Sequence, residues 1–387
     1  MTKFISASIA DAKILNPILN ADGASSQITG FVFEGLLDYD ENLNLRGRLA
    51  TDWRITETVY LTVNSQASFP DGTRVTPDVM EMRIREAIES GNHARLKALV
   101  TEITRLPPEQ QVKEVTLQEE EGKPTLVQVK INKPERLKFS LREVEQDFFT
   151  LLEPIIGADY EKNAPLDQWI EVSSPEKREL LRSQFAELMP LFEHNPIILF
   201  HLRKGVRFHD GHEFDAGDVK FTYESIMAHK NLSPRTSNFE PIKAVEIVDR
   251  YTVRIVYKRL FSPAIDAWSM GILPEHLLNE AALEREMNRR DLSSAARANF
   301  GLRDSQFNRH PIGVGPFRFV EWQSDEFIHL SRNEDYWEGS PEYKDYYYRI
   351  IPDPMTQEVE FLTGAIDSYG PEPHQAARYK KDERYQS

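Results

Sequence analysis

The chain has 387 residues, of which 40% are hydrophobic and 28% are charged, a composition typical of a soluble globular protein with two or three cores. Its 47 basic and 62 acidic residues give a formal net charge of −15, which disfavours nucleic acid or an anionic membrane surface as a partner. The absence of cysteine excludes disulfides, thiolate metal sites and cysteine nucleophiles. The sequence shows no signal peptide and no apolar stretch of membrane-spanning length, so an exported form is expected to carry a leader outside this chain.

The first segment, residues 1–58, is predicted to combine short strands with one helix. Residues 24–37 carry apolar side chains at near-helical spacing, and Gly35 is expected to close that helix. Ser25 or Ser26 is the predicted N-cap. Because helix N-terminal amides could face a ligand carboxylate, the loop 22–26 makes Ser25 and Ser26 candidate ligand-binding residues.

A diverged internal repeat follows. Each copy has an extended segment, an Asp-Gly turn and then a capped amphipathic helix, with the turns at residues 69–72 and 208–211. Thr76 and Asp215 are the predicted caps, and Pro77 fits the first helical position of the first copy. Chance similarity of two hairpin-and-helix segments is the alternative. The strands expected to follow each helix are aligned as 112–115 with 242–245 and 126–131 with 253–258.

The remaining elements are predicted from start signals and periodicity. Ser174 and Pro175 begin a helix that is expected to continue to Met189 as a packing helix between the copies. Residues 278–306 form a charged helical region. Three further elements are predicted: a hairpin at 317–322 and 327–331, a strand at 346–351 and a short helix at 355–361.

Residues 200–211 and 218–224 resemble the signature of family 5 extracellular solute-binding proteins, which include the dipeptide-, oligopeptide- and nickel-binding components of ABC importers. Further segments match the family in the expected order: 16–19 with 33–36, 311–317 with 321–322 and 332–337, and 350–354 with 364–367. The resemblance covers about residues 14–58 and 196–372. It leaves the first copy of the repeat outside the usual family pattern.

The resemblance implies an α/β fold, lobe one of a class II periplasmic-binding-protein architecture, with a mixed sheet flanked by helices and a duplicated α+β accessory subdomain. The expected division is a lobe-one core at 1–58 and 284–369, a first accessory copy at 59–165, a connector helix with the second copy at 166–283, and the start of a crossover at 370–387. The chain reaches Ser387 just after that crossover begins. We therefore expect the second lobe, which holds most of the family's anchors for peptide termini, to lie outside it.

The resemblance also places Trp268, Ser269 and Met270 near the binding cleft and Tyr369 in the hinge region. An aromatic wall with a few polar groups suits a small-molecule site, so these four residues are further ligand-binding candidates. Each could instead have a structural role.

No cofactor or metal is expected. His209, His212 and Glu213 lie close together in the sequence, but their spacing fits no standard zinc motif, and a surface turn is the preferred interpretation. Residues 313–316, Gly-Val-Gly-Pro, are predicted to be a close-packed entry into a strand rather than a phosphate loop. The acidic run 119–121 is predicted to be a solvated turn.

The predicted function is that of a non-enzymatic solute-binding subunit of an ABC importer, a monomer in the periplasm or outside the cell. Its partners would be an extracytoplasmic ligand and a membrane permease. An oligopeptide is the leading ligand class, and nickel chelates, haem or a sugar remain open. One alternative is a protein-interaction module that docks a permease or another partner through the duplicated subdomain. The other is an enzyme with its active site in residues 59–165.

Overall fold

A computed structural model describes residues 2–117, 125–162, 164–259 and 264–380 of the protein. Backbone contacts divide the chain into two compact units. The first contains Met1–Trp53, Phe200–Ile255 and Ser262–Ser387, and the second contains Arg54–Leu199 with Val256–Phe261. The predicted domain boundaries follow sequence similarity rather than contacts, so they remain a proposal. Within the described residues, no helix has the length and apolar character that crossing a bilayer requires.

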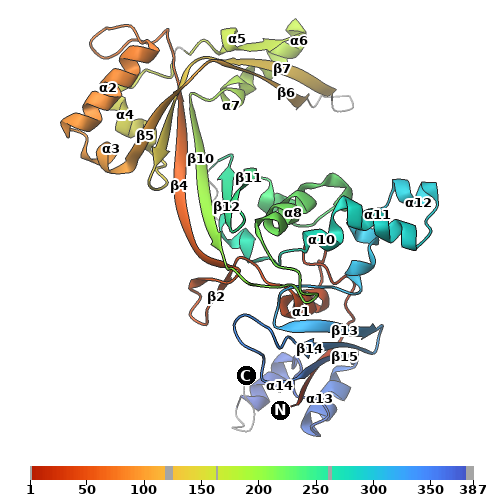
Figure 1. The fold of residues 1–387 in the computed structure, drawn as a ribbon. Helices are drawn as coiled ribbons and strands as arrows, with labels where there is room; N and C mark the ends of the chain where they lie inside the picture. Colours follow the sequence, from red (N-terminus) through yellow and green to blue (C-terminus); the bar gives the residue numbers. More distant parts are fainter. Residues whose placement is uncertain (1, 118–124, 163, 260–263, 381–387) are drawn as a thin grey trace. The chain divides into compact units, whose positions relative to one another are not determined.

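The first unit contains a four-stranded sheet that joins the two ends of the sequence (Figure 1). Its order is β1 (Lys3–Ser8), β15 (Asp345–Ile350), β14 (Phe327–Arg332) and β13 (Phe317–Gln323). β1 pairs with β15 in parallel, and the other neighbours are antiparallel. The N-terminal strand therefore shares one sheet with the predicted hairpin and the predicted strand at 346–351, which are both confirmed.

Helix α1 (Gly23–Val32) begins and ends differently from the prediction. Its N-cap is Asp22, whose side chain accepts a hydrogen bond from the Ser25 amide at 2.8 Å, so the prediction of a serine cap was wrong. The Ser25 hydroxyl instead accepts a hydrogen bond from the Lys13 amide at 2.9 Å. The helix ends at Phe33 rather than at Gly35, because Gly35 already belongs to a segment that packs closely against another part of the chain.

The other elements of the first unit are mostly short helices. Helix α8 (Ala216–Met227) begins at the predicted cap, Asp215. The predicted helical region 278–306 contains α11, α12 and η5, and the predicted helix at 355–361 lies within α13. The remaining elements are β2 (Leu37–Tyr39), β3 (Leu45–Gly47), η2 (His229–Asn231), α9 (Thr236–Phe239), η4 (Asp266–Ser269), α10 (Glu275–Leu278), α11 (Glu280–Arg289), α12 (Ser294–Ala298), η5 (Leu302–Asp304), η6 (Gln306–Asn308), α13 (Pro354–Leu362) and α14 (Pro373–Tyr379).

A six-stranded sheet contains the strand that opens each predicted copy of the repeat and the two strands predicted to end the second copy. Its order is β11 (Ile242–Asp249), β12 (Thr252–Tyr257), β10 (Phe192–Leu202), β4 (Ala50–Thr62), β8 (Arg136–Leu141) and β5 (Val100–Leu106). β4 and β10 are the central strands, and each has residues in both units. Each central strand is followed by a tight turn and a helix.

The helix that follows β4 is α2 (Pro77–Ser90), and its predicted cap, Thr76, is confirmed. The strand alignment proposed for the repeat was wrong, however. Residues 112–115 and 126–131 belong to β6 (Glu109–Leu117) and β7 (Thr125–Lys133), which form a separate three-stranded sheet with β9 (Ile170–Val172). β5 is one edge strand of the six-stranded sheet, and β8 lies next to it. At the opposite edge, β11 and β12 hold the corresponding positions. The hairpin β6–β7 is thus inserted between β5 and β8, and the duplication itself remains a proposal.

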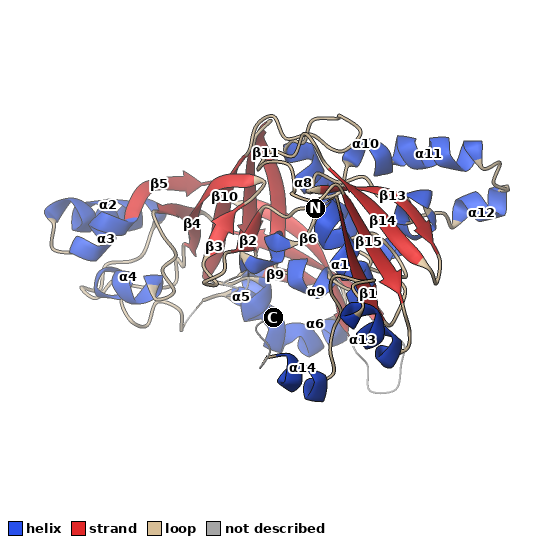
Figure 2. Cartoon of the chain, turned by 90° about the horizontal axis from the view of Figure 1, so that it is seen from below, coloured by secondary structure: helices blue, strands red, loops and turns tan. Residues whose placement is uncertain are grey.

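The second unit, whose helices and strands Figure 2 shows coloured by type, has two apolar clusters. One includes side chains of β4, β5, β8, α2, α3 (Ala94–Leu99) and α4 (Phe148–Ile156). The other includes β7 and β9 with α6 (Pro175–Leu181) and α7 (Phe185–Leu188), and α5 (Leu166–Trp169) lies at its margin. Ser174 caps α6 as predicted, but the expected continuous helix is interrupted by η1 (Arg182–Gln184). The acidic run 119–121 lies outside the described residues.

Candidate functional site

A cavity of about 390 Å³ opens in the first unit, within the size range of small-molecule sites. It is formed by α1 and the residues that follow it, by β2, by η4 and by the region around α9. Its polar lining includes Ser26, Glu34, Asp38, Arg48, Arg235, Asn238, Asp266 and Ser269. Apolar surface comes from Phe33, Phe239 and Met270. Ligand pockets are commonly apolar with a few convergent polar groups, and this cavity is more polar than that common form.

A close backbone crossing builds one wall of the cavity. The Leu36 amide donates to the Trp268 carbonyl at 2.8 Å, and the Ile272 amide donates to the Glu34 carbonyl at 2.9 Å. A Cβ on Gly35 would lie 2.4 Å from the Ser269 carbonyl carbon, so only glycine permits this approach. The crossing fixes Ser269 at the edge of the cavity.

Aromatic packing holds the α9 side of the cavity in place. Trp268 is fully buried, and its ring lies 5.3 Å from the ring of Phe239 and 6.1 Å from that of Phe200. Edge-to-face pairs of this kind stabilise a packing arrangement beyond the burial of their area. Helix α9 and helix η4 are therefore held against each other, and both contribute to the lining.

One charged group of the cavity, Arg48, has its charge balanced within the protein. Its guanidinium forms ion pairs with Glu34 and Glu338, and its Nε lies 3.4 Å from Asp38. Trp337 Nε1 donates to Glu34 Oε2 at 2.7 Å, and the Tyr336 hydroxyl donates to the same carboxylate. Burial acts to lower the pKa of Arg48, but Glu34, Tyr336 and Glu338 together outweigh burial and raise that pKa. This network is a structural wall of the cavity.

Two other charged groups of the cavity are not balanced in this way. Arg235 donates from Nε to the Pro17 carbonyl at 2.6 Å and from Nη2 to Asn20 Oδ1 at 2.7 Å, and burial lowers its pKa. Asp266 accepts a hydrogen bond from the Tyr39 hydroxyl. Among the residues that the structure describes, Arg235 forms no ion pair with a carboxylate and Asp266 forms none with a basic side chain.

Some of the predicted site residues line the cavity and others do not. Ser26, Ser269 and Met270 line the cavity, whereas Ser25 and Trp268 are buried and lie outside the lining. Tyr369 does not line it and packs against Phe361 with ring centroids 5.2 Å apart. Whether any of these residues binds a ligand stays a prediction.

Sequence reasoning missed the cavity residues Asn20, Arg235 and Asn238. Arg235 follows a Ser-Pro pair that reads as an ordinary turn, and neither asparagine belongs to a recognisable motif. Only the folded chain brings these three positions together with η4.

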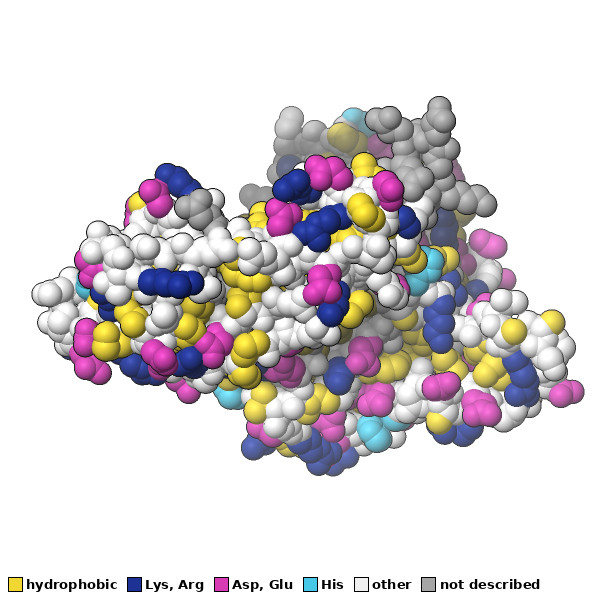
Figure 3. All heavy atoms as spheres, turned by 90° about the horizontal axis from the view of Figure 1, so that it is seen from above, with side chains coloured by type: hydrophobic (Ala, Val, Ile, Leu, Met, Phe, Trp, Pro, Cys, Tyr) yellow, Lys and Arg dark blue, Asp and Glu magenta, His cyan; other side chains and the backbone are white. Residues whose placement is uncertain are grey.

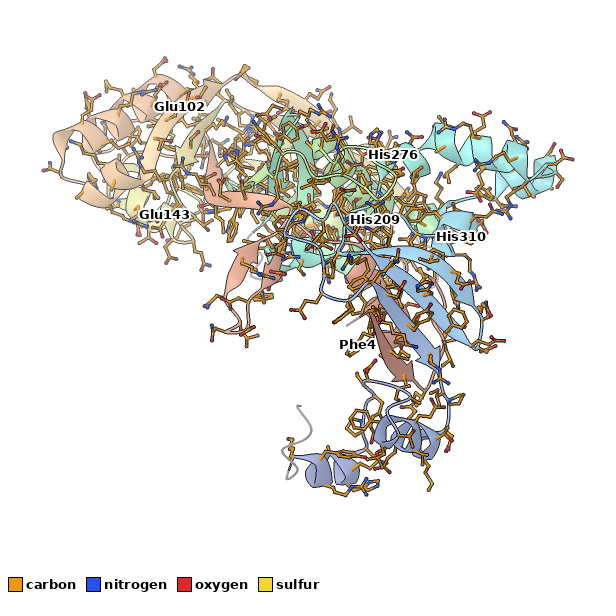
Figure 4. All side chains as sticks on the ribbon, turned by 60° about the horizontal axis from the view of Figure 1, so that its bottom comes forward. Phe4, Glu102, Glu143, His209, His276 and His310 are labelled. Atoms are coloured by element: carbon orange, nitrogen blue, oxygen red, sulfur yellow. The ribbon has the colours of Figure 1, made fainter. Side chains whose placement is uncertain are left out.

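His209, which Figure 4 labels, hydrogen-bonds to the segment 313–315. Its Nε2 bonds the Gly315 carbonyl at 2.9 Å, and the Gly313 amide lies 3.3 Å from its Nδ1. Burial lowers the pKa of His209 to about 4, so the ring is neutral at pH 7. His212 stacks on His276 with ring centroids 3.9 Å apart. Within the described part of the chain, no group of three metal-ligating side chains converges on one point.

Residues 313–316 are a close-packed strand entry, as predicted. A Cβ on Gly313 would lie 1.9 Å from the Val32 carbonyl oxygen, so the backbone approaches the end of α1 directly. The Gly315 amide donates to the same carbonyl at 2.9 Å.

Acidic and basic side chains are interspersed over the face of the molecule that Figure 3 shows.

Comparisons with known proteins give a consistent picture. The family described as "Bacterial extracellular solute-binding proteins, family 5 Middle" matches residues 195–387. The chain is 33% identical over 189 residues to the oligopeptide-binding protein AppA of Bacillus subtilis, a match that covers 48% of this chain and 31% of the relative. It is 30% identical over 178 residues to the glutathione-binding protein GsiB of Pectobacterium atrosepticum, covering 46% of this chain and 31% of that protein. These matches thus span about a third of each relative.

Solved structures agree on the fold. The structure of AppA from Bacillus subtilis with a nonapeptide has a TM-score of 0.52 and 19% identity, covering 98% of this chain and 46% of that one. NikZ from Campylobacter jejuni, in complex with Ni(L-His), has a TM-score of 0.52 and 20% identity, covering 98% and 45%. The mixed α/β architecture is that of class II periplasmic binding proteins.

Proposed function

Since this chain belongs to family 5 of the bacterial extracellular solute-binding proteins, we propose that it captures an extracytoplasmic ligand and presents it to the membrane permease of an ABC importer. An oligopeptide is the proposed ligand class, because AppA is named as an oligopeptide-binding protein and GsiB as a glutathione-binding protein. The proposed location is the periplasm or the cell exterior. Capture would occur by closure of two lobes around the ligand, without chemical change to it.

The cavity of the first unit is the observation that carries this proposal. It combines aromatic and aliphatic surface with hydroxyl, amide and charged groups, which suits a peptide's main chain and side chains. Its wall is fixed by backbone bonds and buried aromatic contacts, so the site is formed before any ligand arrives. A preformed site reduces the entropic cost of binding.

The test is native mass spectrometry of the full-length protein purified from its own compartment. We expect an adduct that denaturation releases and that fragments as a peptide. An empty protein that instead shows reproducible turnover of a substrate would contradict the proposal.

Two glycines of α1 offer a matched control. Gly30 lines the cavity and Gly23 does not, and a Cβ on either would meet no atom within 4 Å. Gly30→Trp is therefore expected to fill the cavity and abolish the adduct, whereas Gly23→Trp should retain it. Retention of the adduct by Gly30→Trp would show that the cavity is not the binding site.

The inserted hairpin β6–β7 does not support the alternative that this chain is a protein-interaction module. Val112 and Leu126 are exposed on one face of β6 and β7. The polar pair Glu114 and Gln128 lies between them in the strand register, so they do not form one continuous apolar patch.

A further inference from the structure

A second cavity of the first unit, with a volume of about 500 Å³, lies beside the second Asp-Gly turn. Its lining comes from residues 205–211, from Arg318 of β13, and from Asn333 and Asp335 just after β14. It shares no lining residue with the cavity described above. We propose that this second cavity binds the phosphate group of a small anion on Arg207 and Arg318, at a site separate from the one proposed for solute capture.

The sequence before this turn is basic although the whole chain is acidic. Residues 201–207 contain Arg203, Lys204 and Arg207 and no acidic residue, in a chain of net charge −15. Of these three cations, Arg207 lines the cavity. Clustered cations raise the local concentration of anions, so this part of the surface favours a negatively charged ligand.

Arg207 keeps most of its hydrogen-bonding capacity available. Its Nη1 donates to the Gly211 carbonyl at 2.9 Å, which uses one of the five N–H groups of a guanidinium. Glu213 faces Arg207 in an isolated β-bridge, but its carboxylate accepts from the Tyr251 hydroxyl at 2.5 Å and pairs with Arg250 at 3.1 Å. Among the residues that the structure describes, no carboxylate forms an ion pair with Arg207. Its charge is therefore open to a ligand.

Arg318 is held in one orientation by neutral groups. Its Nε and Nη2 donate to Asn333 Oδ1 at 3.1 Å and 2.7 Å, and its Nη1 donates to the His209 carbonyl at 3.3 Å. Asn333 is buried, and its side-chain amide donates in turn to the Gly315 carbonyl at 3.2 Å. The guanidinium is thus positioned before a ligand arrives, which lowers the entropic cost of binding.

Asp335 is the lining carboxylate that competes with a ligand for Arg318. Its Oδ2 lies 3.2 Å from Arg318 Nη2, but its side chain is 87% exposed, and so exposed an ion pair contributes little. The other lining carboxylate, Asp210, is already engaged. It pairs with His276 Nε2 at 2.7 Å and accepts from the His212 amide at 3.1 Å. An incoming anion therefore has to displace only Asp335.

Two guanidinium groups match a phosphate better than a carboxylate. A phosphate group carries about 1.5 to 2 negative charges at pH 7 and at least three acceptor oxygens, whereas a carboxylate carries one charge on two oxygens. The planar N–H donors of arginine bind phosphate oxygens in pairs. The cavity also has room for an organic group beside the phosphate, with Phe208 in its lining. Free phosphate and a phosphomonoester are thus the two sources of the same chemistry.

The experiment uses the full-length protein and phosphorus NMR spectroscopy at low ionic strength. Inorganic phosphate and glycerol 3-phosphate are titrated separately, and the broadening of each phosphorus signal gives its Kd. Saturable binding of either one supports the site, and a tighter Kd for glycerol 3-phosphate assigns it to organic phosphates. We expect acetate at equal concentration to leave the broadening unchanged, and equal displacement by acetate would overturn the preference for phosphate.

Variants test the roles of the lining residues. Arg207→Gln and Arg318→Gln should each weaken phosphate binding about tenfold, which is the loss expected for one hydrogen bond to a charged group. Asp335→Asn should instead strengthen binding about threefold, because it removes the competing carboxylate. Arg309→Gln is the control, because Arg309 stacks on Trp322 and lines neither cavity.

The gain expected for Asp335→Asn keeps the test decisive even if an arginine variant does not fold, since misfolding does not tighten binding. Absence of saturable binding for both phosphates overturns the inference, as does weaker binding by Asp335→Asn. The adduct expected from solute capture is measured separately by native mass spectrometry and should persist in Arg207→Gln. Failure of the phosphate site therefore leaves the proposed function standing.

Discussion

The two Asp-Gly turns of this protein have similar sequences but different surroundings. In the second unit, the turn at 69–72 is mostly exposed, and Asp71 pairs with Arg83 of the helix that follows it. In the first unit, the turn at 208–211 inserts His209 against Gly313 and Gly315. Both turns place a glycine at positive φ, and both lead to a capped helix.

The helices after the turns differ in the same way. α2 buries only Met80 and Ile84, whereas α8 buries six residues, including the acidic Asp218. The local signature thus determines a turn and a cap, and the packing of each unit decides whether the turn remains a surface feature or becomes part of the core. Five predictions test this difference, from the largest expected effect to the smallest.

The close approach of Gly313 to α1 should be the most sensitive point. Gly313→Ala places a Cβ 1.9 Å from the Val32 carbonyl oxygen, so α1 must move, and we expect a loss of about 3 kcal/mol in the free energy of unfolding. Denaturant unfolding followed by tryptophan fluorescence in a Trp169→Phe background reports this change, because the other four of the five tryptophans lie in the first unit.

Gly23→Ala is the control for that experiment, because the added Cβ meets nothing within 4 Å. It should change stability little. Similar losses for the two variants would contradict the idea that the strand entry is close-packed.

Substitution of Asp218, in helix α8, should cause the next largest loss of stability. The Asp218 carboxylate accepts from the amides of Asp215 at 3.0 Å and Glu275 at 2.9 Å, so Asp218→Ala leaves two partly buried donors unpaired and should cost about 2–3 kcal/mol. The equivalent third helical position of α2 is Val79, which makes no such cap. Thermal unfolding of the first unit measures the loss.

The same residue should give a distinctive pH dependence. Burial raises the pKa of Asp218 from 3.8 to about 7, so the folded protein binds a proton that the unfolded chain releases. Its contribution to stability is therefore complete below pH 3.8 and decreases as the pH rises toward 7. In Asp218→Asn this decrease should disappear, and a profile that matches the unaltered protein would refute the assignment.

Substitution of His209 should destabilise the protein more than substitution of Pro70, which holds the corresponding position in the other turn. His209→Ala removes two hydrogen-bonded contacts to the glycine segment and should cost about 2 kcal/mol, whereas exposed Pro70→Ala should change stability by about 0.5 kcal/mol or less. Because burial lowers the pKa of His209 from 6.5 to about 4, its contribution is present above pH 6.5 and is lost as the pH falls toward 4. Urea midpoints measured across this range check both statements, and equal effects at the two positions would contradict them.

The ion pair of the exposed turn should have the smallest effect. Arg83 holds the pKa of Asp71 well below its usual range, but the Asp71 carboxylate is exposed to water and ions. Asp71→Asn should lower the midpoint of unfolding only slightly at low salt and not measurably at 1 M salt. A large difference that persists at high salt would show that the two turns are more alike than the structure indicates.

The amino-acid sequence by itself determined the local features of this protein. Thr76, Ser174 and Asp215 cap helices as predicted, and the hairpin formed by β13 and β14 has the expected position, because caps, turns and alternating strands depend on neighbouring residues. The family signature at 200–211 could also be read directly, because it is contiguous in the chain.

Only the tertiary structure decided the features that depend on distant residues. The insertion of β6–β7 between β5 and β8 could not be predicted, because all four strands have similar apolar alternation and their pairing is set by non-local contacts. The cavity likewise combines residues from 17–48, 235–239 and 266–271 through the backbone crossing at Gly35. Arg235 and Asp266 carry no motif, and only the folded chain brings these two positions into the lining of one cavity.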